Sequence, residues 1–559
     1  MQRLRNYWNR WGIKAALGLL LVQMPCWAWA AVINVDFQPG PIGDGWAAAY
    51  TGQGAYPDPG NNTWNIVAPS TDGSFNPWGS GGYYNSNVVV SSLVDSSGAA
   101  TGVGLTVYAD SNTPPNNTGA FATSGTNTYI AQNAINLARD YIIAFNSTTQ
   151  RIEITGLNPT GWYDLYLYGS GDHPIRRTLF EITGANLTSQ NLRTRGVPGV
   201  LHNLQKGNDY VVASGIRPTA GGMITVYYTT AGNSGNAEGV FNGFQLVQRT
   251  DIYQVLISDQ FDQGGPISNP SGIGAGFEYK DINPGIQDPA EGLYGGAPAE
   301  GFLIWARNAN WCFGGLSSKD VWKPVPAVTA HARWTHQRVY VDADQTATYP
   351  QFPGGEQADF RIEYGLVSAN RAVTGNNDLY NNTSGGLYVN LFYEREASAT
   401  NLTLTGNIRA TTKNKPVGDT EGLTGLVTLA TFRLGNVAGI TGGDFGQILD
   451  VIIDADLNGW RVSFADQNGP ITPTVLSGSL SGGWTNLSSV IDGETISFTD
   501  EFLNGVFLFA GAQGMGAGRG SAVFDSVFVY LTVPEPNAWA LFGLGGLLLV
   551  GLGYRRLRR

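Results

Sequence analysis

The sequence predicts an all-β protein of two consecutive β-sandwich domains, flanked by a hydrophobic segment at each end. Charged residues make up only 13 % of the 559-residue chain, whereas glycine alone contributes 76 positions. Short β-branched and aromatic segments alternate with Gly, Asn and Pro turns, and long runs with helical spacing are nearly absent. Between the two ends lie about 500 residues, too many for one hydrophobic core and suited to two domains.

The N-terminal segment has the three parts of a secretory signal peptide. A basic start is followed by the apolar run Ala15–Val22 and then by the small-residue pattern Ala28-Trp29-Ala30. We expect signal peptidase to cut before Ala31, so that residues 1–30 are removed during export. The apolar run is too short to span a bilayer comfortably, which favours cleavage over a retained anchor.

The C-terminal segment combines a short motif, an apolar stretch and a basic cluster. Pro534-Glu535-Pro536 precedes the apolar stretch 538–554, and the chain ends in Arg555, Arg556, Arg558 and Arg559. As a helix the stretch is about 25 Å long, which is marginal for a ~30 Å hydrocarbon core. The arginines hold this end on the cytoplasmic side. We therefore expect the stretch to insert in the inner membrane and pause the exported chain with its body outside.

The order of these parts resembles the PEP-CTERM sorting signal over residues 533–559. The resemblance implies transient insertion in the inner membrane, processing by the membrane protease exosortase, and sorting to the surface of a Gram-negative bacterium. It also implies an exopolysaccharide context. A permanent single-pass anchor is the alternative.

The body between the two signals is strongly acidic. The two ends hold eight of the 32 basic residues and one of the 43 acidic residues, which leaves a body with a net charge of −18. Such a body repels phosphate backbones, so nucleic acid is not an expected partner. With four histidines in all and Cys312 as the single cysteine after residue 30, neither an intramolecular disulfide nor a zinc cage is expected.

The first domain is expected over residues 31–248. Its predicted strands are 32–37, 151–155, 162–169, 223–229 and 240–247, with one short helix at 130–139. The hairpin 154–169, with its Trp162-Tyr163-Asp164-Leu165-Tyr166 strand, and the closing strand 241–247 resemble those of galactose-binding-like jelly rolls. The resemblance implies that fold for this domain.

The second domain is expected over residues 251–532. It contains a predicted hairpin at 448–464 and two alternating strands, 505–511 and 522–529, joined by a glycine-rich loop. The tryptophan-containing hairpin and the closing Phe524-Asp525-Ser526-Val527 strand resemble concanavalin-like and laminin-G-like jelly rolls.

A glycosidase on such a jelly roll would need two carboxylates at alternate positions of one strand. Asp359-Phe360-Arg361-Ile362-Glu363 comes nearest, with Asp359, Arg361 and Glu363 on one face. Glycosidases on concanavalin-like jelly rolls resemble one another in a Glu-x-Asp-x-(x)-Glu strand, and Arg361 stands where that strand has its middle carboxylate. Arg361 would hold both acids ionised, which spoils the proton donor. We therefore expect a solvent-facing row of charges rather than a catalytic pair. The sequence also lacks the Gly-x-Ser-x-Gly motif of a serine nucleophile.

One turn matches the opening of a calcium-binding loop. Asp454, Asp456 and Asn458 place oxygen ligands at alternate positions before Gly459. Ala465, at the twelfth position, cannot supply the closing carboxylate, and an ordinary Asn-Gly hairpin turn explains the same residues. Structural calcium is the one candidate cofactor.

Sugar binding would need an exposed aromatic platform beside polar side chains. Trp46, Trp64 and Trp78 are candidates for the platform, and Asp172 and Arg176 for the polar groups. In the second domain Trp311, Trp322 and Trp484 are comparable. Many of these aromatic residues are expected to fill β-sandwich cores instead.

The sequence thus predicts a non-catalytic exported surface or extracellular-matrix protein, glycan-binding or structural, with a polysaccharide as its candidate ligand. Two alternatives remain. A secreted carbohydrate-active enzyme, a glycoside hydrolase or lyase on the second jelly roll, would require converging carboxylates in a groove. A protein-binding adhesin would have no sugar site.

Overall fold

The structure is a computed structural model, and the residues that it describes fall into the following ranges. The described ranges are 31–38, 49–58, 62–68, 75–78, 81–84, 87–109, 119–123, 130–145, 148–173, 176–185, 191–194, 201–230, 238–259, 277–281, 293–296, 302–306, 313–318, 329–341, 347–348, 357–358, 360–368, 386–394, 403–411, 426–434, 448–455, 459–466, 469–477, 485–486, 488–491, 494–497, 506–514 and 520–532. Both predicted terminal signals, residues 1–30 and 533–559, lie outside these ranges.

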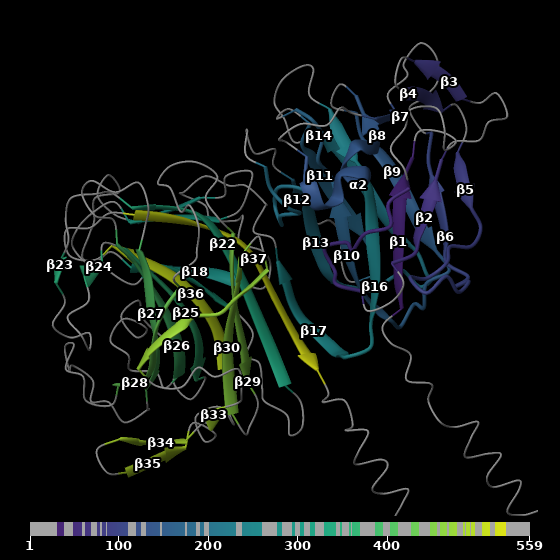
Figure 1. The fold of residues 1–559 in the computed structure, drawn as a ribbon. Helices are drawn as coiled ribbons and strands as arrows, with labels where there is room; N and C mark the ends of the chain where they lie inside the picture. The colour runs from purple at the N-terminus through teal and green to yellow at the C-terminus, as the bar shows by residue number, and fades with distance from the viewer. Residues whose placement is uncertain are drawn as a thin grey trace, which may run out of the picture.

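The described strands divide into two lobes, since no sheet contains strands from both sides of residue 250 (Figure 1). The N-terminal lobe has three sheets. The first has the order β13 (Tyr210–Ile216), β10 (Trp162–Tyr168), β16 (Gly243–Arg249), β1 (Val32–Phe37) and β2 (Trp64–Val67). The second has the order β12 (Asn191–Arg193), β11 (Thr178–Thr183), β14 (Ile224–Thr230), β9 (Gln150–Thr155), β6 (Gly104–Val107) and β5 (Val88–Val90). The third has the order β15 (Gly239–Phe241), β8 (Asp140–Ala144), β7 (Gly119–Thr123), β4 (Gly81–Tyr84) and β3 (Phe75–Trp78).

The core of the N-terminal lobe lies between the first two sheets. Alternate residues of β10, such as Leu165 and Leu167, belong to the same buried cluster as Ile152 and Ile154 of β9. The 3-10 turn η1 (Gln132–Ala134) and helix α2 (Ile135–Arg139) coincide with the predicted helix. Alternation of apolar side chains therefore identified these strands correctly.

The C-terminal lobe is a sandwich of two large sheets. The nine-stranded sheet has the order β19 (Leu293–Gly296), β20 (Phe302–Ala306), β37 (Gly520–Thr532), β22 (Thr329–Val341), β29 (Leu449–Ala455), β30 (Gly459–Asp466) and β31 (Gly469–Ile471), with β17 (Ile252–Asp259) on β37 and β33 (Thr485–Asn486) on β30. The eight-stranded sheet has the order β18 (Phe277–Asp281), β21 (Phe313–Ser318), β36 (Val506–Gly514), β25 (Phe360–Ser368), β26 (Gly386–Glu394), β27 (Thr403–Thr411), β28 (Leu426–Arg433) and β32 (Thr474–Ser477). Two small hairpins, β23 (Ala347–Thr348) with β24 (Gln357–Ala358) and β34 (Ser488–Ile491) with β35 (Glu494–Ser497), complete the described strands.

A buried histidine links these two sheets through the core. His336 of β22 has 0 % exposure, and its Nδ1 and Nε2 lie 2.5 Å and 2.6 Å from the hydroxyl oxygens of Tyr364 and Tyr393. Trp334 and Phe524 pack beside Tyr364. The all-β prediction is confirmed for the described residues. The assignment of the two lobes to galactose-binding-like and laminin-G-like domains stays a prediction.

Candidate functional site

The outer face of the eight-stranded sheet carries an unusual set of buried polar residues. Phe360, Ile362 and Tyr364 of β25 point into the sandwich core. Successive side chains of a strand alternate between the two faces, so Arg361 and Glu363 lie on the outer face. Glu363 is only 6 % exposed. The expectation of a solvent-facing row of charges is therefore wrong for Glu363, because its side chain is buried.

Neighbouring strands extend this polar surface into two parallel rows. The first, here called the amide row, consists of Glu363, Asn390, Asn407 and Thr431, which are register partners across β25 to β28. All four are buried. The second, here called the arginine row, consists of Arg361, Phe392, Thr405 and Arg433, which are register partners across the same strands. Arg433 is exposed and Thr405 half-buried, so this row reaches solvent.

Asn390 and Asn407 form the centre of the amide row. Asn390 Nδ2 donates to Asn407 Oδ1 at 3.1 Å, and both side chains have 0 % exposure. Within the described part of the chain, Asn390 Oδ1 and Asn407 Nδ2 have no hydrogen-bond partner. A buried polar atom without a partner costs about 1–3 kcal/mol. The pair therefore keeps one acceptor and one donor unused at a cost in stability.

The chemistry of the two rows suits a polyhydroxylated ligand. An amide oxygen accepts from a hydroxyl and an amide nitrogen donates to one. Phe392 and Tyr388 of β26 lie on the same face of the sheet, but their rings are buried and offer no exposed platform. Glu363 has Asn390 and Gly511 as cross-strand partners, so neither position opposite it supplies a second carboxylate. Arg361 Nη1 lies 3.8 Å from Glu363 Oε2. Asp359 lies outside the described residues.

The candidate sugar-binding residues of the N-terminal lobe do not come together in the described structure. Trp64 is 7 % exposed and packs against Tyr50 and Tyr168, so it is a core residue rather than a platform. Trp46 lies outside the described residues, as do Trp311, Trp322 and Trp484 in the other lobe. Trp78 lies on β3, with its side chain outside the description.

Asp172 and Arg176 do contact each other, and their contacts define a local ion-pair network. Arg176 Nη1 donates to Asp172 Oδ1 and, at 2.7 Å, to the hydroxyl of Tyr141. Arg176 Nε donates to Glu238 Oε2 at 2.6 Å. The guanidinium is therefore occupied by three partners of the protein itself.

Asp454, from the candidate calcium turn, is also occupied by side chains of the protein. His331 Nδ1 lies 2.6 Å from Asp454 Oδ1, and Arg461 Nε donates to Asp454 Oδ2 at 2.8 Å. Burial would raise the pKa of Asp454, but His331 and Arg461 outweigh it and lower that pKa. Asp456 and Asn458 lie outside the described residues. Within the described part of the chain, no group of three His, Cys, Asp or Glu side chains could hold a metal ion.

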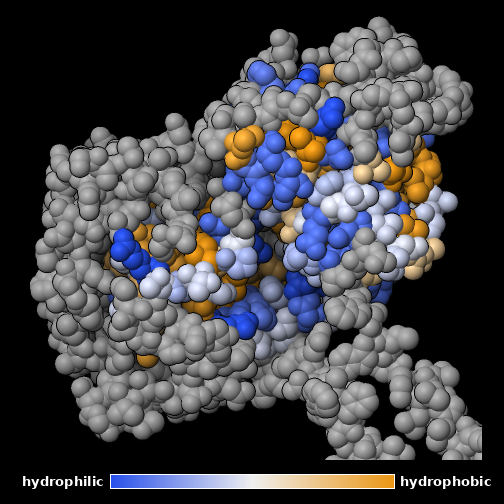
Figure 2. All heavy atoms as spheres, in the orientation of Figure 1, coloured by the Kyte–Doolittle hydropathy of each residue, from blue (hydrophilic) through white to orange (hydrophobic). Residues whose placement is uncertain are grey.

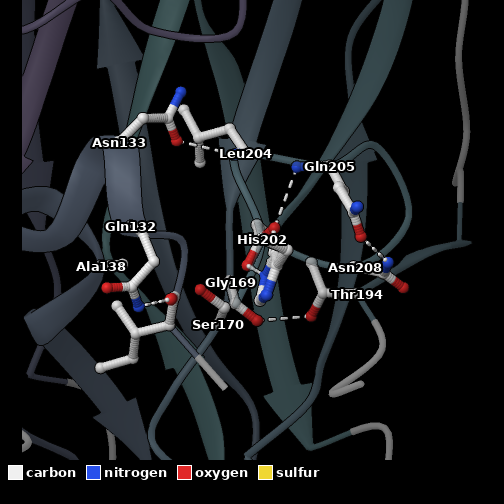
Figure 3. A network of polar contacts seen from close by, with 12 residues as sticks. Gln132, Asn133, Ala138, Gly169, Ser170, Thr194, His202, Leu204, Gln205 and Asn208 are labelled. Carbon is white, nitrogen blue, oxygen red and sulfur yellow. Dashed lines mark hydrogen bonds and ion pairs between the residues drawn. The ribbon is translucent and has the colours of Figure 1, made fainter. Parts of the chain in front are cut away.

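Ser170 and His202 of the N-terminal lobe are drawn in Figure 3, and both contact the carboxylate of Asp209. Asp209 Oδ1 and Oδ2 each lie 3.1 Å from His202 Nε2, Asp209 Oδ2 accepts from the backbone N–H of Gln205 at 2.9 Å, and the carboxylate also accepts from Ser170. A nucleophilic triad needs the histidine between serine and aspartate, whereas here the aspartate lies between. The cluster therefore fixes segment 201–209 on the lobe.

That segment contacts the other lobe. Lys206 Nζ lies 3.2 Å and 3.3 Å from the two carboxylate oxygens of Asp450 on β29. Gly215, at a φ of 65°, lies against Phe528 and Val255, so closely that a Cβ would come within 2.5 Å of the Phe528 ring. Figure 2 shows hydrophilic side chains along the line where the lobes meet. The spacing of residues in the sequence did not predict these contacts between the lobes.

Comparison with known proteins identifies the tail. The PEP-CTERM protein-sorting motif matches residues 532–559, which confirms the resemblance stated above and indicates an exported protein. No curated protein sequence matches the chain. No helix among the described residues is long and apolar enough to cross a membrane.

Several solved structures are similar to part of this chain. The carbohydrate recognition domain of Emp47p is 12 % identical, covers 51 % of this chain and 100 % of its own, and has a TM-score of 0.27. A seed lectin of Lotus tetragonolobus is 12 % identical, covers 47 % and 95 %, and has a TM-score of 0.24. A legume lectin-like domain from Entamoeba histolytica is 11 % identical, covers 49 % and 96 %, and has a TM-score of 0.26. Likenesses this distant do not transfer the ligands of those proteins to this chain.

Proposed function

We propose that the protein is a non-catalytic, exported surface or matrix protein that binds a neutral polysaccharide on the outer face of its eight-stranded sheet. The proposal depends on one observation. Asn390 and Asn407 present a buried acceptor and a buried donor that form no hydrogen bond with any other described residue. Two hydroxyls of a sugar ring supply the missing donor and acceptor.

The charges of the face support a neutral ligand. Glu363 lies beside Arg361, so that the two opposite charges offset each other. Arg433 lies at the exposed end of the arginine row. The proposal has the ligand approach the buried amides from that side. The net charge of −18 on the body works against binding of a polyanion. Neither calcium nor any other cofactor is part of the proposal.

The test is affinity electrophoresis of the folded body, residues 31–532, in gels that contain β-glucan, galactan or mannan. Retardation by at least one neutral polysaccharide, lost in Asn390→Ala and Asn407→Ala, is the expected result. Asn158→Ala, in an exposed turn of the other lobe, serves as the matched control and keeps the retardation. If both central variants migrate like the wild type in every gel, the amide row is not the site.

The same material separates binding from catalysis. Incubation with each polysaccharide is followed by an assay for new reducing ends and for the unsaturated products of a lyase. The proposal expects no products. Products that the wild type forms and Glu363→Gln does not would make the protein a carbohydrate-active enzyme instead.

A further inference from the structure

The first and last residues of the folded body lie at the same end of the molecule. The carbonyl of Ala31 accepts from the backbone N–H of Gln248 at 3.0 Å. β16 ends one residue later, and β17 begins at Ile252, whose register partner is Thr532. Figure 1 shows the β16–β17 turn near the tip of β37. We call this region the junction end.

The fold continues up to the residue at which the sorting motif begins. Thr532 is the last residue of β37, and the match to the motif starts at the same position. Its exposure is 9 %, it pairs with Ile252 and Thr329, and its Oγ1 lies 2.7 Å from His331 Nε2. The folded body therefore ends directly at the motif, without a spacer.

The tether to the membrane is consequently short. Five residues, 533–537, separate Thr532 from the apolar stretch. Fully extended they reach about 18 Å, whereas the thirteen residues of β37 extend about 43 Å. The junction end must stay close to the bilayer for as long as the apolar stretch is inserted.

Charge and side-chain type decide which way the body faces. The net charge of −18 disfavours lying flat on an anionic bilayer. The junction end carries a half-buried Trp162, the register partner of Arg249, with the guanidinium of Arg217 at 5.7 Å from its ring centroid. Arg217 Nε also donates to the carbonyl of Pro159 at 3.1 Å. Tryptophan and arginine are side chains that settle at the headgroup level of a bilayer.

We propose that the unprocessed chain is held with its junction end against the lipid headgroups of the inner membrane, so that Trp162 and Arg217 meet the bilayer and the opposite ends of both lobes point away from it. The junction end is thus an interaction site for lipid headgroups, and it leaves the membrane when exosortase releases the body. It does not depend on glycan binding.

Two exposed threonines at opposite ends of the N-terminal lobe provide the test. Thr160 lies in the turn before Trp162, and Thr149 lies just before β9, about 20 Å away along that strand. The chain from Ala31 to Arg559, in a Cys312→Ser background, is labelled at Thr160→Cys or Thr149→Cys with a fluorescent dye. It is reconstituted through its tail into vesicles with a spin-labelled headgroup. The dye at position 160 should be quenched and the dye at 149 should not. Equal quenching at both positions, or stronger quenching at 149, overturns the proposal.

A spacer variant tests the tether itself. About 20 Gly and Ser residues between Thr532 and Val533 add a mean span of about 25 Å. Quenching at position 160 should then fall toward that at 149. If quenching at position 160 is unchanged, the short tether does not orient the body, and the proposal that the tether holds the junction end at the membrane is wrong.

Discussion

Lys206 of the N-terminal lobe and Asp450 of the C-terminal lobe form an ion pair between residues 244 positions apart, with 3.2 Å from Nζ to Oδ1. Arg333 Nε donates to Asp450 Oδ2 at 3.0 Å, and the Thr335 hydroxyl donates to Oδ1 at 2.6 Å. Burial would raise the pKa of Asp450, but the charges of Arg333 and Lys206 hold it well below its usual range. One carboxylate thus joins the two lobes.

Replacing Asp450 should destabilise the protein strongly. Asp450→Asn leaves Arg333 and Lys206 without their shared anion, and breaking a buried pair from one side costs about 3–5 kcal/mol. Lys206→Met removes the contact between lobes while Asp450 keeps Arg333, so its cost should be smaller. Urea unfolding of the three proteins measures both effects. An Asp450→Asn variant as stable as Lys206→Met would contradict this account.

Acid should destabilise the C-terminal lobe through His336. Burial lowers the pKa of His336 to about 3, against about 6.5 in the unfolded chain. The unfolded state therefore binds a proton first, and stability present above pH 6.5 is lost as pH falls. Between pH 7.5 and pH 5 this amounts to about 2 kcal/mol. His336→Gln, whose amide can still bond both tyrosines, should lose this component of the pH dependence in denaturant titrations.

Asp36 should make the stability of the N-terminal lobe fall as pH rises, which is opposite to the effect of His336. Burial, assisted by the charge of Asp140, raises the pKa of Asp36 to about 8. The folded state keeps this proton between about pH 4 and pH 8 while the unfolded state releases it, so stability falls as pH rises. The loss is about 1.4 kcal/mol per pH unit in that window. Asp36→Asn should remove it. Asp95→Asn should not, since hydrogen bonds from Ser97 and Ala99 offset burial and lower the pKa of Asp95.

The unpaired atoms of the amide row should lower the stability of the protein and should be required for polysaccharide binding. Asn390→Leu alone leaves Asn407 Oδ1 without its donor and should cost about 1–3 kcal/mol. Asn390→Leu with Asn407→Leu removes all four polar atoms and should be as stable as the wild type or more stable. Thermal unfolding measures stability, and gel retardation measures binding. A double variant that still binds polysaccharide would exclude the amides as the ligand contacts.

Local patterning predicted much of the fold. The alternation of Ile33, Val35 and Phe37 located β1 at its observed bounds, and the Asn458-Gly459 turn located the β29–β30 hairpin. Both signals are local, because side-chain alternation and turn chemistry act over a few residues.

The candidate site could not be predicted in the same way. Asn390 and Asn407 alternate with apolar residues, as any outward polar residue of a half-buried strand does. Their burial depends on what covers the outer face, and their pairing depends on the register of β26 with β27. Neither is a property of one segment. Trp64 shows the converse, since this candidate platform residue is the first residue of β2 and is buried against Tyr50 and Tyr168.

The position of β37 has a consequence for biogenesis. This final strand lies between β20 and β22 inside the nine-stranded sheet and also pairs with β17. Export proceeds from the N-terminus, so the C-terminal lobe lacks an interior strand until almost the whole polypeptide has crossed the membrane. The segment that completes the lobe emerges just ahead of the apolar stretch, which we expect to stop translocation. Folding of that lobe and arrest of the chain are therefore nearly simultaneous events.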